Sequence, residues 1–180
     1  MGRIEKMNVP KRGKRSGALM NITRWKMDIL DTLRKDDEIS KLLFYDSEDA
    51  LSRKTLTDDQ QVDLVNSKLI GYRYVPEVVE KTGSYISIGI SHFEPQESFR
   101  QFSDDYVMGY ITFYILCDMA IMNTEDGYRN DLLAARVYDL FQESSEYGMG
   151  TLRLDTALEL WTQNNKFGGY TLSFKVVDFK

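Results

Sequence analysis

The sequence predicts an α+β fold, in which a mainly antiparallel mixed sheet carries helices packed on one face. The first half holds short stretches with apolar residues at helical spacing, whereas segments after Pro76 alternate apolar and polar residues. A single helical segment interrupts the strand-like ones, an order typical of an antiparallel sheet covered from one side. The length of 180 residues suits one domain with an extension.

The predicted helices begin near residue 21. In "NITRWKMDILDTLRK", Asn21 or Thr23 is placed to cap a helix whose apolar stripe includes Ile29. "DEISKLLF" predicts a short second helix, and "TDDQQVDLVNSKLI" opens with Thr57 and Gln60 at capping-box spacing. The clearest apolar stripe lies in "YRNDLLAARVYDLFQES", and the glycines of "EYGMG" are expected to end that helix.

Three segments alternate in the manner of half-buried strands. "GSYISIGISHF" sets Ile86, Ile88 and Ile90 against small or polar residues, and a polar loop with Pro95 follows. "TLRLDTALELW" and "GYTLSFKVVDF" alternate likewise, with "TQNNKFGG" between them as a hairpin loop. In the first of this pair we expect one unbroken face, formed by Leu152, Leu154, Thr156, Leu158 and Leu160.

The stretch "YVMGYITFYILCD", residues 106–118, is apolar almost throughout. It is shorter than the roughly 20 residues of a membrane helix, and its Tyr, Ile, Phe and Thr favour a strand. Alternate residues separate an apolar core face from a face with Tyr106, Tyr110 and Tyr114. We expect this tyrosine face to be buried by a neighbouring subunit, or else by the poorly patterned segment 46–76 of the same chain.

The charge is distributed unevenly along the chain. Residues 1–17 hold six Lys or Arg and one acid, a net charge of +5, which leaves −10 for the rest of a chain whose total is −5. We expect a flexible basic N-terminal arm over residues 1–20, attached to a single α+β domain over 21–180. Lys11, Arg12, Lys14 and Arg15 are its candidate contacts with DNA or an acidic protein surface, and the alternative is a solubilising tail.

Recognisable catalytic motifs are absent from the sequence, which has no glycine-rich phosphate loop, GxSxG elbow or HExxH. His92 is the one histidine and has no evident nucleophile beside it, and Cys117 is the one cysteine, expected to be core packing. We therefore expect no enzyme activity, catalytic residue, cofactor or zinc site. Without a membrane span or signal-peptide core, synthesis in a reducing cytosol is expected, with no membrane contact.

Three pairs of adjacent aspartates are the remaining candidates for chemistry. Asp36–Asp37, Asp58–Asp59 and Asp104–Asp105 lie at predicted helix starts or in loops, where acids cap helices and complement the helix dipole. The alternative is a small metal-dependent enzyme that uses Asp104 or Asp105.

The order of elements over residues 21–180 resembles that of the tail terminator (tail completion) proteins of long-tailed bacteriophages and related head–tail neck proteins. A helix of the type "MDILDTLRKDDEIS", a strand and an acidic loop precede the long aromatic strand ending in Asp. "EDGYRNDLLAARVYDLF", "LRLDTALELW" and "GGYTLSFKVVDF" follow in turn. The basic arm and the extended segment 46–82 depart from the pattern, which leaves open which neck component this is.

The resemblance implies a structural virion protein without catalytic residues. Its homo-oligomeric ring, usually of six subunits, caps the tail tube, stops tube polymerisation and joins the tail to a head–tail connector or stopper protein. DNA would pass through the lumen without specific binding, which an acidic body suits. The implied location is the neck of the virion, assembled in the host bacterial cytoplasm. The alternatives are another neck component, such as a connector or stopper, or a nucleic-acid-binding module that uses the basic arm.

Overall fold

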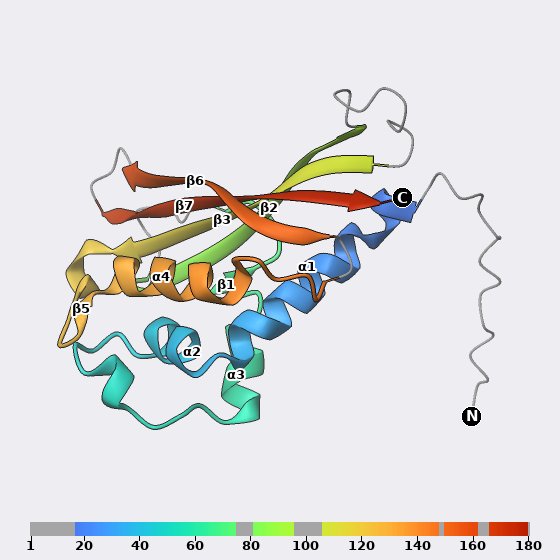
Figure 1. The fold of residues 1–180 in the computed structure, drawn as a ribbon. Helices are drawn as coiled ribbons and strands as arrows, with labels where there is room; N and C mark the ends of the chain where they lie inside the picture. Colours follow the sequence, from blue (N-terminus) through green and yellow to red (C-terminus); the bar gives the residue numbers. More distant parts are fainter. Residues whose placement is uncertain (1–16, 75–80, 96–105, 148–149, 162–165, 180) are drawn as a thin grey trace, which may run out of the picture.

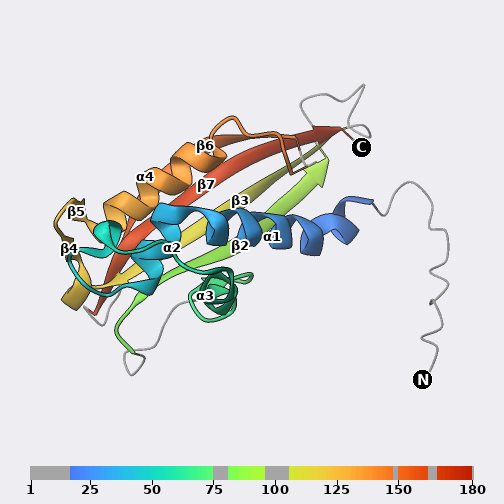
Figure 2. The same ribbon diagram turned by 90° about the horizontal axis from the view of Figure 1, so that it is seen from below.

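The computed structural model describes residues 17–74, 81–95, 106–147, 150–161 and 166–179, with the backbone alone for residues 17–20, 92–95, 106–108, 161 and 177–179. It confirms the predicted α+β class. The helices of this part of the chain lie against one face of a five-stranded sheet, as Figures 1 and 2 show from two directions.

The sheet has the strand order β1-β2-β3-β7-β6. Its strands are β1 (Leu69–Ile70), β2 (Ser84–Pro95), β3 (Tyr106–Asp118), β6 (Thr151–Trp161) and β7 (Phe167–Phe179). All neighbours are antiparallel except β1 and β2, which makes the sheet mixed. A separate small hairpin is formed by β4 (Asn123–Thr124) and β5 (Gly127–Tyr128).

The helices on the covered face are α1 (Gly17–Lys35), α2 (Asp37–Phe44), α3 (Asp58–Leu64) and α4 (Arg129–Phe141), with short 3₁₀ turns at Ala50–Ser52 and Met119–Ile121. The predicted capping box at the start of α3 is confirmed, since the side chains of Thr57 and Gln60 each bond the other's backbone N–H. The expected cap at Asn21 or Thr23 is wrong, because α1 begins at Gly17 and includes four residues of the predicted arm.

The end of α4 also differs from the prediction. The helix stops at Phe141, with Gln142 as its C-cap, before the glycines of "EYGMG". Glu143 itself adopts φ +61°, the left-handed conformation that a glycine was expected to supply. Side-chain identity alone does not reveal a non-glycine residue held in this conformation, which is uncommon.

The main core lies between the sheet and the helices, and aromatic rings form its centre. The ring of Phe113 in β3 lies 4.7 Å from that of Phe141 in α4 and 5.7 Å from that of Phe174 in β7. The expected packing role of Cys117 is confirmed by its complete burial, which raises the pKa of its thiol to about 11. A thiol in this environment stays neutral and unreactive at ordinary pH.

Arg129, the first residue of α4, is fully buried in this core. Its guanidinium donates hydrogen bonds to four backbone carbonyls, those of Leu42 (2.7 Å), Tyr45 (2.8 Å), Ser47 (2.8 Å) and Ile121 (2.9 Å). The first of these carbonyls belongs to the last turn of α2, where the helix dipole favours a cation. One side chain thereby joins α4, α2 and the turn after β3, a role that the sequence analysis missed.

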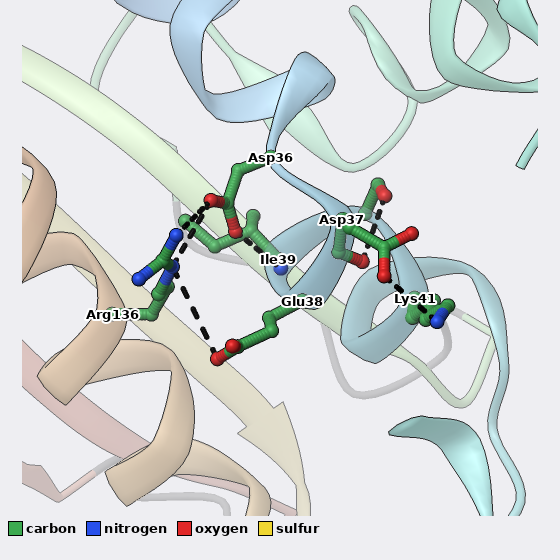
Figure 3. A network of polar contacts seen from close by, with 7 residues as sticks. Asp36, Asp37, Glu38, Ile39, Lys41 and Arg136 are labelled. Atoms are coloured by element: carbon green, nitrogen blue, oxygen red, sulfur yellow. Dashed lines mark hydrogen bonds and ion pairs between the residues drawn. The ribbon is translucent and has the colours of Figure 1, made fainter. Parts of the chain in front are cut away.

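A second polar network holds α2 against α4, as Figure 3 shows. Asp36 caps α2 by accepting from the Ile39 N–H (3.0 Å), and its other oxygen accepts from Arg136 Nη2 (2.7 Å) and Nε (3.0 Å). Lys41 pairs with Asp37 at 2.8 Å and lowers the pKa of that carboxyl by hydrogen bonding. The capping interpretation of the first aspartate pair is thus confirmed.

The expected unbroken face of β6 is wrong. The pairing register with β7 shifts between Leu154 and Thr156, so Asp155 is an extra residue in the edge strand. Leu152 and Leu154 therefore point to the helices, whereas Leu158 points to the opposite face of the sheet. A bulge with a charged residue also makes an edge strand less prone to unspecific pairing.

Candidate interaction surface

The helix-free face of the sheet is the candidate functional surface, and residues 70–74 of the same chain cover one end of it. Ser87 in β2 accepts from the Tyr74 N–H (3.3 Å) and donates to the Tyr74 carbonyl (3.1 Å). Ile70, Tyr85 and Leu116 are buried in a small second core on this side. The alternative that segment 46–76 covers the tyrosine face therefore holds for this end of the sheet.

Tyr114 lies under the same covering segment. The guanidinium of Arg73 is 5.2 Å from the centre of its ring, within the range of a cation–π contact. Its ring also packs over Gly89 of β2, where a Cβ atom would lie 3.2 Å from the tyrosine Cε2. The half-buried state of Tyr114 is thus explained within one subunit.

The other two tyrosines are placed differently. Tyr110 is half-buried on the same face, opposite Lys175 of β7 and Ser91 of β2. The backbone of Tyr106 belongs to β3, but its side chain lies outside the described residues. The strand places all three residues on one face by register, and their role as a subunit interface stays a prediction.

The other half of this face has little cover from the described residues. Thr156 and Leu158 of β6 lie beside Ser173 and Thr171 of β7. We call these four residues the open strip. The side chain of Leu158 is 60% exposed, and the outer edge of β6 pairs with no strand among the described residues. An exposed leucine beside a free strand edge is a surface suited to protein–protein contact.

The described residues contain no group of three or more His, Cys, Asp or Glu side chains that could hold a metal ion. Asp58 and Asp59 lie in the first turn of α3, as predicted, whereas Asp104–Asp105 and the side chain of His92 lie outside the described part of the chain. No helix among the described residues is long and apolar enough to cross a membrane.

The basic residues of the predicted arm, Lys11, Arg12, Lys14 and Arg15, also lie outside the described residues.

The fold and this surface define a small α+β protein whose sheet is covered by helices on one face. Comparison with known proteins identifies its family. The chain belongs to the YomW family, whose model matches residues 36–176. This family derives from Bacillus phages, so the chain is a phage-associated protein. The matched residues run from Asp36, the N-cap of α2, to Val176 within β7, and leave out α1 and the predicted basic arm. No curated protein and no solved structure matches the chain.

Proposed function

We propose that this chain is a structural virion protein that caps the phage tail tube as a homo-oligomeric ring. In this role it stops tube polymerisation and joins the tail to a head–tail connector or stopper protein at the neck. The observation that carries the proposal is the open strip beside the free edge of β6, in a chain that belongs to a phage-derived family. Such a surface suits burial by a neighbouring subunit.

Charge supports the same role. The residues after the arm carry −10, and an acidic ring lets DNA pass through its lumen without holding the phosphates. The function is structural, so no catalytic residue, cofactor or metal is part of the proposal. The ring would assemble in the host bacterial cytoplasm and remain in the virion neck.

The mass of the full-length protein in light scattering, followed by electron microscopy, tests the ring. We expect closed particles with a central hole, of roughly six subunits, or a monomer that forms such caps when incubated with tail tubes. Tubes that continue to elongate in the presence of the protein would overturn the terminator role. Binding to a connector or portal in place of tail tubes would assign the chain to another neck component.

Nucleic-acid binding is the second candidate, because six of the first 17 residues are Lys or Arg. Titration with duplex DNA at several salt concentrations tests it. Affinity that falls steeply with salt, and is lost when Lys11, Arg12, Lys14 and Arg15 are changed to Ala, would favour this candidate. Affinity that these substitutions leave unchanged would exclude it.

A further inference from the structure

A pocket of about 500 Å³ lies at the end of the sheet where β6 finishes and β7 begins. Its walls are largely apolar, with Leu160 and Phe167 from the sheet, and Met119 and Met122 from the turn after β3. At Gly168 a Cβ atom would lie 3.4 Å from the Met119 sulfur, so the absence of a side chain there keeps the space open.

The polar groups of the pocket are mainly acceptors, and its charged ones are negative. Asp131 from α4 and Glu159 from β6 both line it. Tyr170 donates its hydroxyl hydrogen bond to Asp131, which raises the pKa of the tyrosine. The side-chain oxygen of Asn130 is buried and has no hydrogen-bond partner among the described residues. A ligand that suits the two carboxylates donates hydrogen bonds and carries positive charge.

No Lys, Arg or His side chain is among the described residues that line the pocket. Lys166, next to it in the sequence, has its amine 3.7 Å from the Asp118 carboxylate and 5.3 Å from the centre of the ring of Phe167, which lines the pocket. The negative charge of the pocket is therefore not balanced by a lysine or arginine of its own lining.

The combination of apolar walls and an acidic rim suits one kind of side chain. Lys and Arg have long aliphatic stems that pack against apolar surface and a cationic head that stays at the rim. Tyr128, which is 59% exposed at the pocket, offers a ring for a cation–π contact with that head.

The chain itself carries a cationic segment of this kind, residues 11–15, "KRGKR". Figures 1 and 2 place the first turn of α1 at the end of the sheet opposite the β4–β5 hairpin, beside which the pocket lies. Lys11 is six residues before Gly17, a reach of at most about 21 Å. The 13 residues of β3 span about 43 Å, so the segment falls short of the pocket in its own subunit.

We propose that this pocket binds a Lys or Arg side chain from residues 11–15 of a second copy of the chain. This contact joins neighbouring subunits in the proposed ring, so the inference rests on that proposed function. Because the first turn of α1, which follows this segment, and the pocket lie at opposite ends of the sheet, the contact is head-to-tail. Contacts of this type repeat from subunit to subunit and close into a ring when the rotation allows.

Zero-length cross-linking of the full-length protein tests the contact directly. Equal amounts of ¹⁴N- and ¹⁵N-labelled protein are mixed and treated with a carbodiimide, which joins lysine amines to nearby carboxylates. We expect mixed-isotope cross-links from Lys11 or Lys14 to Asp131 or Glu159. Cross-links within one isotope only would overturn the head-to-tail contact. Cross-links distributed evenly over many acids, including the exposed Asp139 and Asp155, would show that the basic segment binds by charge alone. That result would overturn the pocket as the binding site of the segment.

Paired variants separate the pocket from general acidity. Asp131→Asn with Glu159→Gln removes two charges from the pocket, whereas Asp139→Asn with Asp155→Asn removes two from the same helix and the same strand outside it. In light scattering, alone or on tail tubes, we expect the first pair to lower the amount of ring particles at least tenfold and the second to change it less than twofold. This readout is used because the first pair also removes the carboxylates that the carbodiimide needs. Equal losses in both pairs would contradict the proposal, and thermal unfolding checks that each variant folds.

Light scattering on the same samples distinguishes failure of the contact from failure of the ring. One outcome is that rings persist in the pocket variant while the unaltered protein shows no cross-links from Lys11 or Lys14 to Asp131 or Glu159. That result would overturn the contact and leave the ring proposal standing. A protein that stays monomeric alone and on tail tubes would overturn the ring. The cross-links between isotopes would then support or refute the pocket contact independently.

Discussion

The two faces of the sheet differ in how the chain covers them, and adjacent residues of β3 show the contrast. Phe113 points to the helices and is fully buried among aromatic rings. Tyr114 points to the other face and is half-buried under Arg73. The helix-covered face is completed within one subunit and holds the fold together, whereas the helix-free face is covered at one end only by the described residues. Stability and assembly are therefore expected to depend on different faces.

The largest effect is expected from Phe113→Ala, which empties the centre of the core. Truncation of a buried phenylalanine costs about 3–5 kcal/mol, the sum of lost transfer free energy and a cavity. Urea unfolding followed by circular dichroism measures it. Leu158→Ala is the control on the opposite face, and because its side chain is 60% exposed we expect a change of at most about 0.5 kcal/mol. Equal losses for the two variants would contradict the contrast between the faces.

Arg129→Lys is expected to rank second, with a loss of about 2–3 kcal/mol in the free energy of unfolding. The ammonium of lysine cannot reproduce the planar guanidinium, which donates hydrogen bonds to four carbonyls on separate segments. Some of these buried acceptors would therefore lose their partners. Arg136→Lys is the matched control, since that side chain is one-third exposed and serves carboxylates. We expect the control to lose about 1 kcal/mol or less, and a reversed order would refute the assigned role of Arg129.

A pH-dependent effect is expected from Cys117 on the helix-covered face. Burial raises the pKa of its thiol from 9.0 to about 11, so the neutral thiol favours the folded state. This contribution is complete below pH 9 and is lost as the pH rises toward 11, because the unfolded chain ionises first. Urea unfolding of the wild-type protein and Cys117→Ala should show a stability difference that shrinks over this range. A difference that stays constant from pH 8 to 11 would contradict this prediction.

The smallest effect on stability is expected from Leu158→Asp in the open strip, at most about 0.5 kcal/mol, because the leucine is mostly exposed in the subunit. If this strip is buried between subunits, the buried charge should nevertheless abolish the ring. Light scattering measures the loss. Val62→Asp, at a 55% exposed position of α3 on the other side of the sheet, is the matched control and should keep the ring. Rings that form equally in both variants would exclude the open strip as an interface.

Much of the fold follows from local pattern. The period of two in residues 84–90 and 106–118 predicted β2 and β3, and the apolar stripe after Tyr128 predicted α4. The capping box at Thr57 could be predicted because both partners lie within four residues of each other. The sequence also identified the tyrosine face by register, although its use as an interface stays a prediction.

The structural features that the sequence did not predict share a physical cause, since each depends on residues distant in the sequence. The bulge at Asp155 exists only in relation to β7, and a shift of one residue moves every later side chain to the other face. The carbonyl partners of Arg129 in and after α2 lie at least 82 residues away, and nothing local marks this arginine as buried. The same holds for the acidic pocket, which combines α4, β6 and the turn after β3.

The sequence by itself determined the α+β class, the position of the main strands and helices, the basic start of the chain and the acidic character of the remainder. These properties reside in composition and in periodicities of two and 3.6, which any short segment carries. The tertiary structure decided which half of the helix-free face is covered, how Arg129 is used and where the acidic pocket forms. Those outcomes depend on which distant segments meet, because burial and hydrogen bonding are settled by neighbours in space.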